Sequence, residues 1–271
     1  MIYKYITNNP EVASFVENAG VKEIFLDLEK VGKAERQQGR DTFLSTHVIS
    51  DITKVKKSIN TANLLVRTDS INFLERETIE QIIDNGADIL MLPMVKSHVD
   101  VEQLLNMVRG RIKISLLLET SSSIVNLDRI LEHSNDISEV YLGLNDMHIS
   151  MGLDFMFQLL SGDIVELMTR KISKTGIRYG FGGIGRIGEG IINPELVMSE
   201  HIRLGSESVI LSRAFRGNTS SLESLKAAMN FEEELRKLNN VFCNMKGESE
   251  LTFHERKLKL RSVVDNFVLQ R

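Results

Sequence analysis

The sequence predicts an α/β protein whose fold is a (β/α)8 barrel, the TIM barrel, followed by a helical C-terminal extension. Short apolar runs that suit buried strands recur along the chain, helical patterns separate most of them, and acidic residues gather where runs end. A length of 271 residues suits one such domain. The alternative is an open doubly wound sheet. We favour the barrel because there are eight runs, and because barrel enzymes carry their chemistry at the carboxyl ends of the strands.

Each predicted strand is a short, nearly continuous apolar run. Strands in parallel sheets are covered on both faces, so their sequences do not alternate between apolar and polar residues. The eight runs are residues 3–7, 23–28, 64–67, 89–93, 113–119, 139–143, 178–182 and 208–212.

Four of the intervening segments have apolar residues at helical spacing and end at a glycine. In the first, Val12, Phe15, Val16 and Ala19 share one face, and Gly20 is placed to end the helix. Residues 30–51 instead form a long polar connection, and long connections in compact domains are usually functional or mobile. The predicted helices are residues 10–20, 78–86, 100–110 and 194–205.

The chain divides into a barrel domain, residues 1–217, and a C-terminal extension, residues 218–271. Apolar residues at heptad-like spacing predict a helix over residues 222–238, and a second helical stretch covers residues 252–269. This is more helix than one barrel needs. The extension either exchanges with a neighbouring subunit or folds on its own barrel, and the sequence leaves both possibilities open.

Composition excludes several classes of protein. The net charge of −4 argues against nucleic acid as the main partner, since duplex-binding proteins usually carry a strong basic excess. The N-terminus lacks the pattern of a signal peptide, and no window approaches 18 apolar residues, so we expect a cytoplasmic protein without a membrane partner. The single cysteine, Cys243, excludes an internal disulfide framework.

Two acidic residues, Glu119 and Asp146, each close an apolar run, and the two runs are successive predicted strands. Both side chains should therefore emerge at the same edge of the sheet, on strands about 5 Å apart. Two carboxylates at this separation repel each other unless a cation or a proton lies between them. A divalent metal ion with oxygen ligands is the simplest solution, so the sequence predicts a metal-dependent enzyme. The alternative is that each acid merely caps the helix that follows it.

Three charged residues end the neighbouring runs. Arg67 should point into the mouth of the barrel, where its guanidinium group can hold a carboxylate or a developing oxyanion. Asp27 and Glu29 are two residues apart on a strand and share a face, so both are candidates for the catalytic site. A structural ion-pair network among Asp27, Glu29, Arg67 and nearby lysines is the alternative.

Histidine residues supply candidate proton shuttles. His47 lies in the long connection, and His148 comes two residues after Asp146. The connection also holds basic residues that could attract an anionic substrate, although such a run is more often simply solvated; they are Lys30, Lys33, Arg36 and Arg40.

The segment 180–190 is unusually rich in glycine and follows the seventh predicted strand. Backbone N–H groups in such a loop can bind a phosphate or carboxylate, as barrels often do near strands seven and eight. We expect Gly183 and Arg186 to contact the substrate. A tight turn that requires positive φ angles is the alternative.

Together, these segments resemble the HpcH/HpaI aldolase and citrate lyase β-subunit family. The resemblance runs over residues 24–152, and the motifs that carry it are FLDLE at 25–29, VR at 66–67, LPMV at 92–95, LET at 118–120 and GLND at 143–146. It implies a Mg²⁺ or Mn²⁺ ion held by Glu119 and Asp146, contact of Arg67 with a pyruvate-like keto acid, and a homo-oligomer that often exchanges C-terminal helices.

The resemblance also places Gly143, Leu144 and Asn145, beside the second metal ligand, at the substrate. The aldolases of the family have a catalytic histidine directly after the acid that Glu29 matches, whereas this chain has Lys30. The proton acceptor therefore remains open among His47, Lys30, an acidic residue and a metal-bound water.

The function that we expect is that of a divalent-metal-dependent carbon–carbon lyase, of the class II pyruvate aldolase type. It would cleave or form a hydroxy-keto acid through a pyruvate enolate, with an aldehyde as the second partner. Two alternatives remain: a thioester lyase of the citryl-CoA or malyl-CoA type, and a non-catalytic barrel that serves as a binding subunit.

Overall fold

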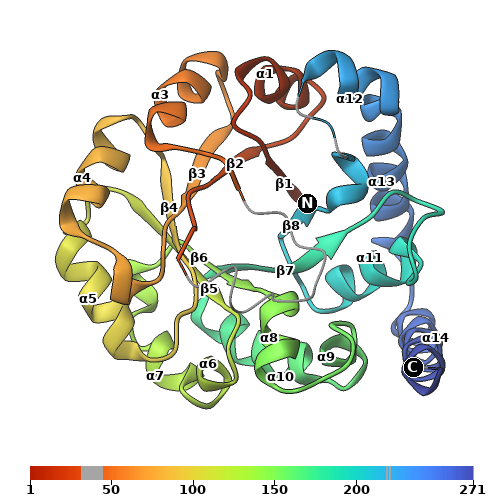
Figure 1. Cartoon of the computed structure of the whole chain (residues 1–271). Coiled ribbons are helices and arrows are strands. Elements are labelled where there is room, and N and C mark those ends of the chain that lie inside the picture. The colour runs from red at the N-terminus through yellow and green to blue at the C-terminus, as the bar shows by residue number, and fades with distance from the viewer. Residues whose placement is uncertain (32–44, 218, 220, 271) are drawn as a thin grey trace.

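Eight parallel strands close into a barrel in the computed structural model, which describes residues 1–31, 45–217, 219 and 221–270 (Figure 1). Each strand pairs with the next along the chain, and the last pairs with the first. The barrel prediction is confirmed, and the closed ring excludes the open sheet. The strands are β1 (Ile2–Ile6), β2 (Glu23–Asp27), β3 (Asn63–Arg67), β4 (Ile89–Leu92), β5 (Lys113–Leu118), β6 (Glu139–Leu142), β7 (Arg178–Ile184) and β8 (Ser208–Leu211).

Helices surround this ring (Figure 1). All four predicted helical segments are helical, although each helix ends before its glycine. The last three residues of the predicted connection are helical instead, because α3 begins at Ile49, and Asp51 accepts the Val48 N–H group at 3.1 Å in its first turn. The helices are α1 (Pro10–Asn18), α3 (Ile49–Ser58), α4 (Arg76–Asp84), α5 (His98–Val108), α6 (Ser121–Val125), α7 (Leu127–Leu131), α8 (Leu144–Ser150), α9 (Gln158–Ser161), α10 (Ile164–Ile172) and α11 (Pro194–Arg203).

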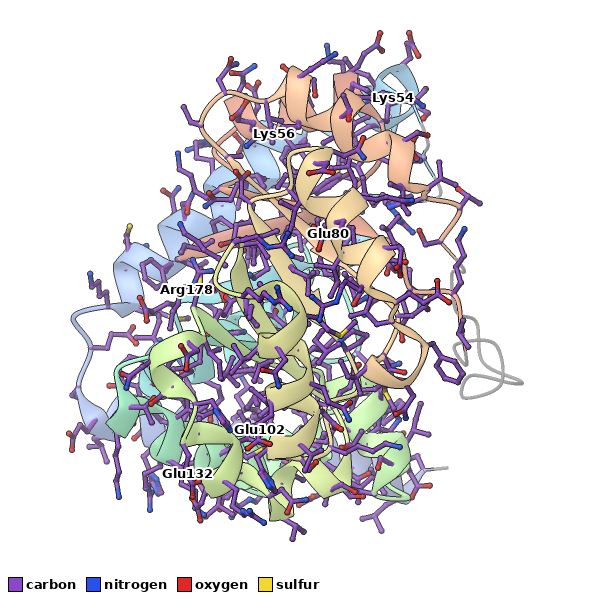
Figure 2. The ribbon with its side chains drawn as sticks, turned by 90° about the vertical axis from the view of Figure 1, so that its left-hand side faces the viewer. Lys54, Lys56, Glu80, Glu102, Glu132 and Arg178 are labelled. Atoms are coloured by element: carbon purple, nitrogen blue, oxygen red, sulfur yellow. The ribbon has the colours of Figure 1, made fainter. Side chains whose placement is uncertain are left out.

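The outer surface of these helices carries many charged side chains. Figure 2 shows Lys54 and Lys56 on α3, Glu80 on α4 and Glu102 on α5. No helix within the described residues has both the length and the apolar character needed to cross a membrane.

The interior of the barrel changes character from its amino-terminal to its carboxyl-terminal end. At the amino-terminal end, the fully buried Lys4 is ion-paired with Glu23 and with Glu139, at 2.7 Å from the latter. The middle layer is an apolar cluster that fills the barrel, with members Phe25, Leu65, Ile89, Met91, Leu117 and Tyr141. Above this cluster, charged side chains reappear at the carboxyl ends of the strands.

The C-terminal extension forms three helices, α12 (Leu222–Ala228), α13 (Phe231–Met245) and α14 (Glu250–Leu269). The predicted helix over residues 222–238 is interrupted, because Asn230 caps α13 by accepting the Glu233 N–H group at 3.1 Å. The last helix packs on α9 and α11 of its own barrel, where Leu260 is fully buried, and Arg261 donates to the Ser161 carbonyl at 2.9 Å.

Candidate active site

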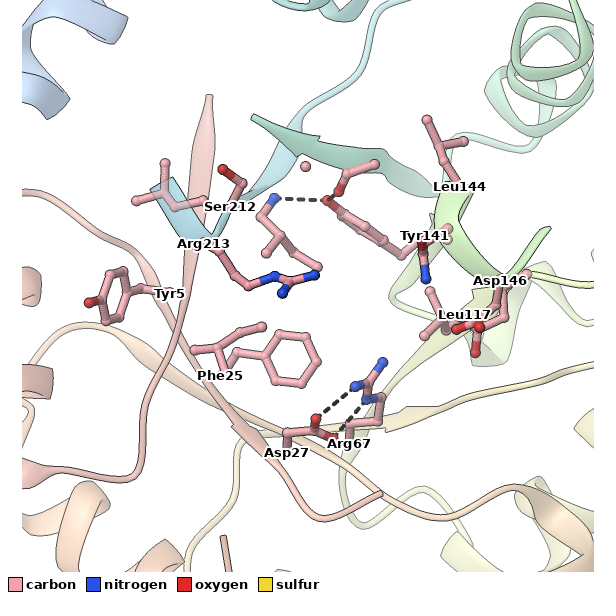
Figure 3. Close-up of a pocket in the computed structure, with 18 of the residues that line it drawn as sticks. Tyr5, Phe25, Asp27, Arg67, Leu117, Tyr141, Leu144, Asp146, Ser212 and Arg213 are labelled. Atoms are coloured by element: carbon pink, nitrogen blue, oxygen red, sulfur yellow. Dashed lines mark hydrogen bonds and ion pairs between the residues drawn. The ribbon is translucent and has the colours of Figure 1, made fainter. Parts of the chain in front are cut away.

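A cavity of about 340 Å³ opens at the carboxyl ends of the strands (Figure 3). Its floor is the apolar cluster of the barrel interior, and its rim carries carboxylates, arginines and a histidine. Most of the predicted site residues meet here. The residues lining it are Tyr5, Ile6, Phe25, Asp27, Ser45, His47, Arg67, Leu117, Glu119, Tyr141, Gly143, Leu144, Asn145, Asp146, Met156, Gly182, Gly183, Ile210, Leu211, Ser212, Arg213 and Arg216.

Glu119 directly follows β5, and its side chain is almost completely buried. One carboxylate oxygen, Oε1, accepts the backbone N–H group of Met94 at 3.0 Å. Burial and the nearby negative charge of Asp146 raise the pKa of Glu119 well above its usual value, although the positive charge of Arg67 opposes them. Ionised Glu119 is therefore unfavourable in this position unless a further positive charge compensates it.

Two backbone features hold the Glu119 carboxylate in place. Met94 has a φ angle of 56°, a left-handed conformation that is uncommon outside glycine, and in this conformation its N–H group donates to the carboxylate. Gly143 leaves the space that the other oxygen occupies, because a Cβ atom there would lie 2.7 Å from Glu119 Oε2. The glycine that follows β6 is therefore needed for close approach to the acid.

Asp146 is the fourth residue after β6, whereas Glu119 directly follows β5. It is in the first turn of α8, not at the end of β6, and it is partly exposed at the rim of the cavity (Figure 3). Glu119 and Asp146 provide the oxygen donors that a divalent cation prefers, and a cation between them would relieve the repulsion that raises the pKa of Glu119. The donor set thus fits Mg²⁺ or Mn²⁺. Among the residues described, His, Cys, Asp and Glu side chains form no group of three or more suited to a metal.

Arg67, the last residue of β3, is held by the two acids that were predicted beside it. Its guanidinium group donates to both carboxylate oxygens of Asp27, at 2.9 and 2.7 Å, and its Nη2 atom lies 3.4 Å from Glu29 Oε2. Burial opposes the charge of Arg67, but Asp27, Glu29 and Glu119 together outweigh it and raise the pKa of Arg67. Arg67 therefore shows both of the predicted arrangements: it belongs to an ion-pair network, and it lines the cavity. It is a permanent cation facing the site.

His47 lies in the long connection, and its ring contacts the end of β2. Its Nδ1 atom accepts the backbone N–H group of Asp27 at 2.9 Å, and Ser45 Oγ donates to the Asp27 carbonyl at 2.7 Å. Because Nδ1 is an acceptor, the neutral ring carries its proton on Nε2. In this tautomer Nε2 is a hydrogen-bond donor, which differs from the proton acceptor for which His47 was one of four candidates.

The other predicted residues are divided between the cavity and its surroundings. Gly143, Leu144, Asn145 and Gly183 line the cavity. Arg186 does not; it donates to Glu189 at 3.0 Å within the loop after β7. His148 is buried in α8, with Nδ1 3.3 Å from the Leu144 carbonyl. Among the basic residues of the connection, Lys30 is exposed outside the cavity, and Lys33, Arg36 and Arg40 lie outside the described residues.

Several residues of the cavity were not predicted. Tyr141 donates to the Gly182 carbonyl at 2.7 Å and accepts the Ile210 N–H group at 2.8 Å, and in this way it ties β6 to β7 and β8 (Figure 3). Arg213 and Arg216 follow β8 and add two cations. Arg213 and Arg216 have the same sequence signal as Arg67, which is a charged residue after an apolar run. Tyr141 lies within an apolar run, and nothing in that run indicates that its hydroxyl group forms hydrogen bonds.

Residues 5–157 match the family model described as HpcH/HpaI aldolase/citrate lyase. This chain belongs to that family. The match covers more than half of the chain and includes Asp27, Glu29, Glu119 and Asp146, so the family resemblance predicted from the motifs is confirmed. The HpcH/HpaI family comprises aldolases and lyases, which supports an enzymatic role for the chain.

Solved structures share the fold of this HpcH/HpaI family member. A family protein from Burkholderia cenocepacia is 12% identical with a TM-score of 0.62, over 87% of this chain and 94% of that one. An HpcH/HpaI aldolase from Desulfitobacterium hafniense is 14% identical with a TM-score of 0.60, over 92% and 94%. Citrate synthase SbnG is 14% identical with a TM-score of 0.59, over 83% and 93%. A comparison with curated proteins finds no match.

Proposed function

We propose that the protein is a divalent-metal-dependent carbon–carbon lyase that forms or cleaves a hydroxy-keto acid through the enolate of a pyruvate-like keto acid. In the forming direction, carbon 3 of the keto acid loses a proton and bonds to the carbonyl carbon of an aldehyde, whose oxygen gains a proton. The observation that carries this proposal is the Glu119–Asp146 pair beside Arg67, in which burial and like charge raise the pKa of Glu119.

Glu119 and Asp146 would hold the metal ion, either Mg²⁺ or Mn²⁺. When bound, such an ion supplies a Lewis acid that stabilises negative charge on the keto acid and on its enolate. Met94 and Gly143 position Glu119 for this role, one through a backbone hydrogen bond and the other by leaving space.

Arg67 would bind the keto acid and stabilise negative charge that develops during the reaction. Asp27 holds the guanidinium group by two hydrogen bonds, so little reorganisation is needed when charge appears. His47 would donate a hydrogen bond from Nε2 to a substrate oxygen, because its Nδ1 atom is occupied by the Asp27 N–H group. Gly143, Leu144 and Asn145 line the wall beside the metal ligands and would shape the keto-acid site.

The first test measures entry of solvent deuterium into the methyl group of pyruvate, which requires enolate formation but no aldehyde. We expect exchange with Mg²⁺ and its loss after chelation. Glu119→Gln should lower the rate at least about 100-fold, since it removes charge at the metal site while keeping the shape. Glu102→Gln, an exposed substitution on α5, is the matched control. Exchange that survives chelation, or that survives in Glu119→Gln, would contradict the proposal.

A second test uses Gly143→Ala. The new Cβ atom would lie 2.7 Å from Oε2 and 2.8 Å from Cβ of Glu119, so the acid must move. We expect the affinity for Mn²⁺, measured by calorimetry, to fall by about 10–100-fold, as for other groups that orient metal ligands. Gly247→Ala has no atom within 4 Å of the new methyl group and should leave the affinity unchanged. Equal affinity in both variants would argue against Glu119 as a ligand.

Cleavage assays and the exchange test distinguish the two alternatives. A citryl-CoA or malyl-CoA lyase would cleave acyl-CoA substrates and leave free hydroxy-keto acids intact. A non-catalytic barrel would show no metal-dependent exchange at all.

A further inference from the structure

The pairing of β7 with β8 is interrupted by a β-bulge where the two strands line the cavity. Gly180 pairs with Ser208 and Gly183 pairs with Ile210, so two residues of β7 lie opposite one residue of β8. One of these two, Gly182, has a φ angle of 58°, a conformation that few residues other than glycine adopt. The glycine at this position therefore permits the bulge.

The hydroxyl group of Tyr141 lies in this bulge and bonds to a backbone group on each strand (Figure 3). It donates to the Gly182 carbonyl at 2.7 Å and accepts the Ile210 N–H group at 2.8 Å. A bulge disrupts the regular ladder of backbone hydrogen bonds, and here one side chain bridges the disrupted stretch. Burial raises the pKa of Tyr141 well above its usual value, so the hydroxyl group keeps the proton that it donates.

The neighbouring strand leaves room for the ring of Tyr141. A Cβ atom at Gly180 would lie 2.7 Å from Cε2 of the ring and would collide with the Ser208 carbonyl. The ring is almost completely buried in the apolar cluster that forms the cavity floor. Packing of the ring therefore holds the hydroxyl group in the bulge, and Tyr141→Phe removes the hydroxyl group while keeping the ring.

The bulge also contacts the helix that carries Asp146. A Cβ atom at Gly182 would lie 3.0 Å from Cδ1 of Leu144, which is buried and is the first residue of α8. Helix α8 packs on β7, and its Met147 N–H group donates to the Gly143 carbonyl at 3.1 Å. Asp146 is in the same first turn. The turn that carries Asp146 therefore rests on the bulge.

We propose that Tyr141 is a positioning residue: its hydroxyl group holds the β7 bulge, and through the bulge and Leu144 it fixes the first turn of α8 and the Asp146 carboxylate. The inference rests on the proposed function in its last step, in which Asp146 binds a metal ion. The hydroxyl group acts on the site through the backbone, because both of its hydrogen bonds are to backbone groups.

The first test measures amide hydrogen exchange by mass spectrometry in the metal-free Tyr141→Phe variant. We expect the peptide of β8, where the Ile210 N–H group loses its acceptor, and the peptide of α8 each to exchange at least about tenfold faster than in the wild type.

Tyr179→Phe is the matched control for this test, because Tyr179 lies on the same strand and donates to the Leu204 carbonyl at 2.6 Å, outside the bulge. It should leave the amide exchange of β8 and α8 unchanged. Unchanged amide exchange of α8 in Tyr141→Phe, or a rise shared equally by the amides of α5, would contradict a positioning role.

The second test measures the affinity for Mn²⁺ by calorimetry. Tyr141→Phe should bind Mn²⁺ about tenfold more weakly than the wild type, and Tyr179→Phe should bind it equally well. Gly182→Ala disturbs the same bulge, so the double variant Tyr141→Phe, Gly182→Ala should bind little more weakly than the poorer of the two single variants.

The two tests together separate this inference from the proposed chemistry. Faster amide exchange of α8 in Tyr141→Phe, with no Mn²⁺ binding and no deuterium entry into pyruvate in the wild type, would support the positioning of α8 and contradict the lyase. Mn²⁺ binding by the wild type with the same affinity in Tyr141→Phe would overturn the positioning role alone.

Discussion

At the scale of single residues, the proposed chemistry depends on one carboxylate in an unfavourable position. Glu119 is almost completely buried, lies near Asp146 and has a raised pKa. Its folded-state pKa exceeds the unfolded value of 4.5, so its contribution to stability is fully present below pH 4.5 and is lost as the pH rises through the folded pKa. Without metal, the ionised side chain therefore destabilises the protein near neutral pH.

Glu119→Gln should accordingly stabilise the metal-free protein at pH 7.5, by about 1–2 kcal/mol in the free energy of unfolding. The amide oxygen of glutamine can still accept the Met94 N–H group. The difference should shrink near pH 4, where the wild-type side chain is protonated. Urea unfolding at both pH values measures it, and Mg²⁺ should stabilise the wild type but not the variant. A variant that is less stable than the wild type at pH 7.5 would contradict the conclusion that ionised Glu119 destabilises the metal-free protein.

Sequence patterns identified the residues at strand ends but not the contacts that define their roles. Arg67 and Glu119 were predicted because a charge that closes an apolar run stands out. The hydrogen bond from Asp27 to His47, which sets the tautomer of the ring, joins residues 20 positions apart and has no local signal. Arg213 and Arg216 follow β8 in the same way, whereas the glycine-rich segment before β8 predicts a role for Arg186, which pairs with Glu189 instead.

At the scale of elements, the strands were predicted well because burial on both faces leaves an unmistakable apolar run. Helices depend on capping residues that are harder to recognise. Residues 45–51 are mostly polar and so predict a loop where α3 begins, and Asn230 divides a continuous heptad-like pattern into α12 and α13. Whether the extension also contacts a second subunit, as the family resemblance implies, stays a prediction.

The contact of α14 with its own barrel should contribute strongly to stability. Leu260 is fully buried where α14 packs on α9 and α11, so Leu260→Ala should lower the free energy of unfolding by about 2–5 kcal/mol. Leu251→Ala, on the same helix with the side chain 68% exposed, should change it by less than about 0.5 kcal/mol. Urea denaturation compares the two. Equal small effects would indicate that α14 does not rest on this barrel in solution.

At the scale of the whole molecule, a buried ion-pair network and the candidate active site lie at opposite ends of the barrel axis. The amino-terminal end holds a buried network in which Lys4 bridges Glu23 and Glu139, and Ser208 Oγ donates to Glu139 at 2.7 Å. Residues of β1, β2, β6 and β8 are thus joined on the inside of the ring. The apolar layer above separates this network from the cavity.

Lys4→Met should be strongly destabilising, by about 3–5 kcal/mol, because it leaves buried carboxylates without their central cation. Burial opposes the charge of Glu139, but Lys4, Arg178 and Ser208 outweigh it and lower its pKa. The contribution of Glu139 is thus present above its unfolded pKa of 4.5 and lost as the pH falls through the folded value. The loss in Lys4→Met, measured by thermal unfolding, should therefore be larger at pH 7 than at pH 3. Lys54→Met, 60% exposed on α3, is the control.

The left-handed backbone at Met94 places an N–H group where its resonance can report the charge of Glu119. Its amide proton points at Glu119 Oε1 from 3.0 Å, measured between the heavy atoms, and so it senses the electric field of that oxygen. The chemical shift of this one amide signal in a nuclear magnetic resonance spectrum should follow the charge on the acid. A titration that follows this signal would give the proton affinity of Glu119 in the native chain, without any substitution at the site.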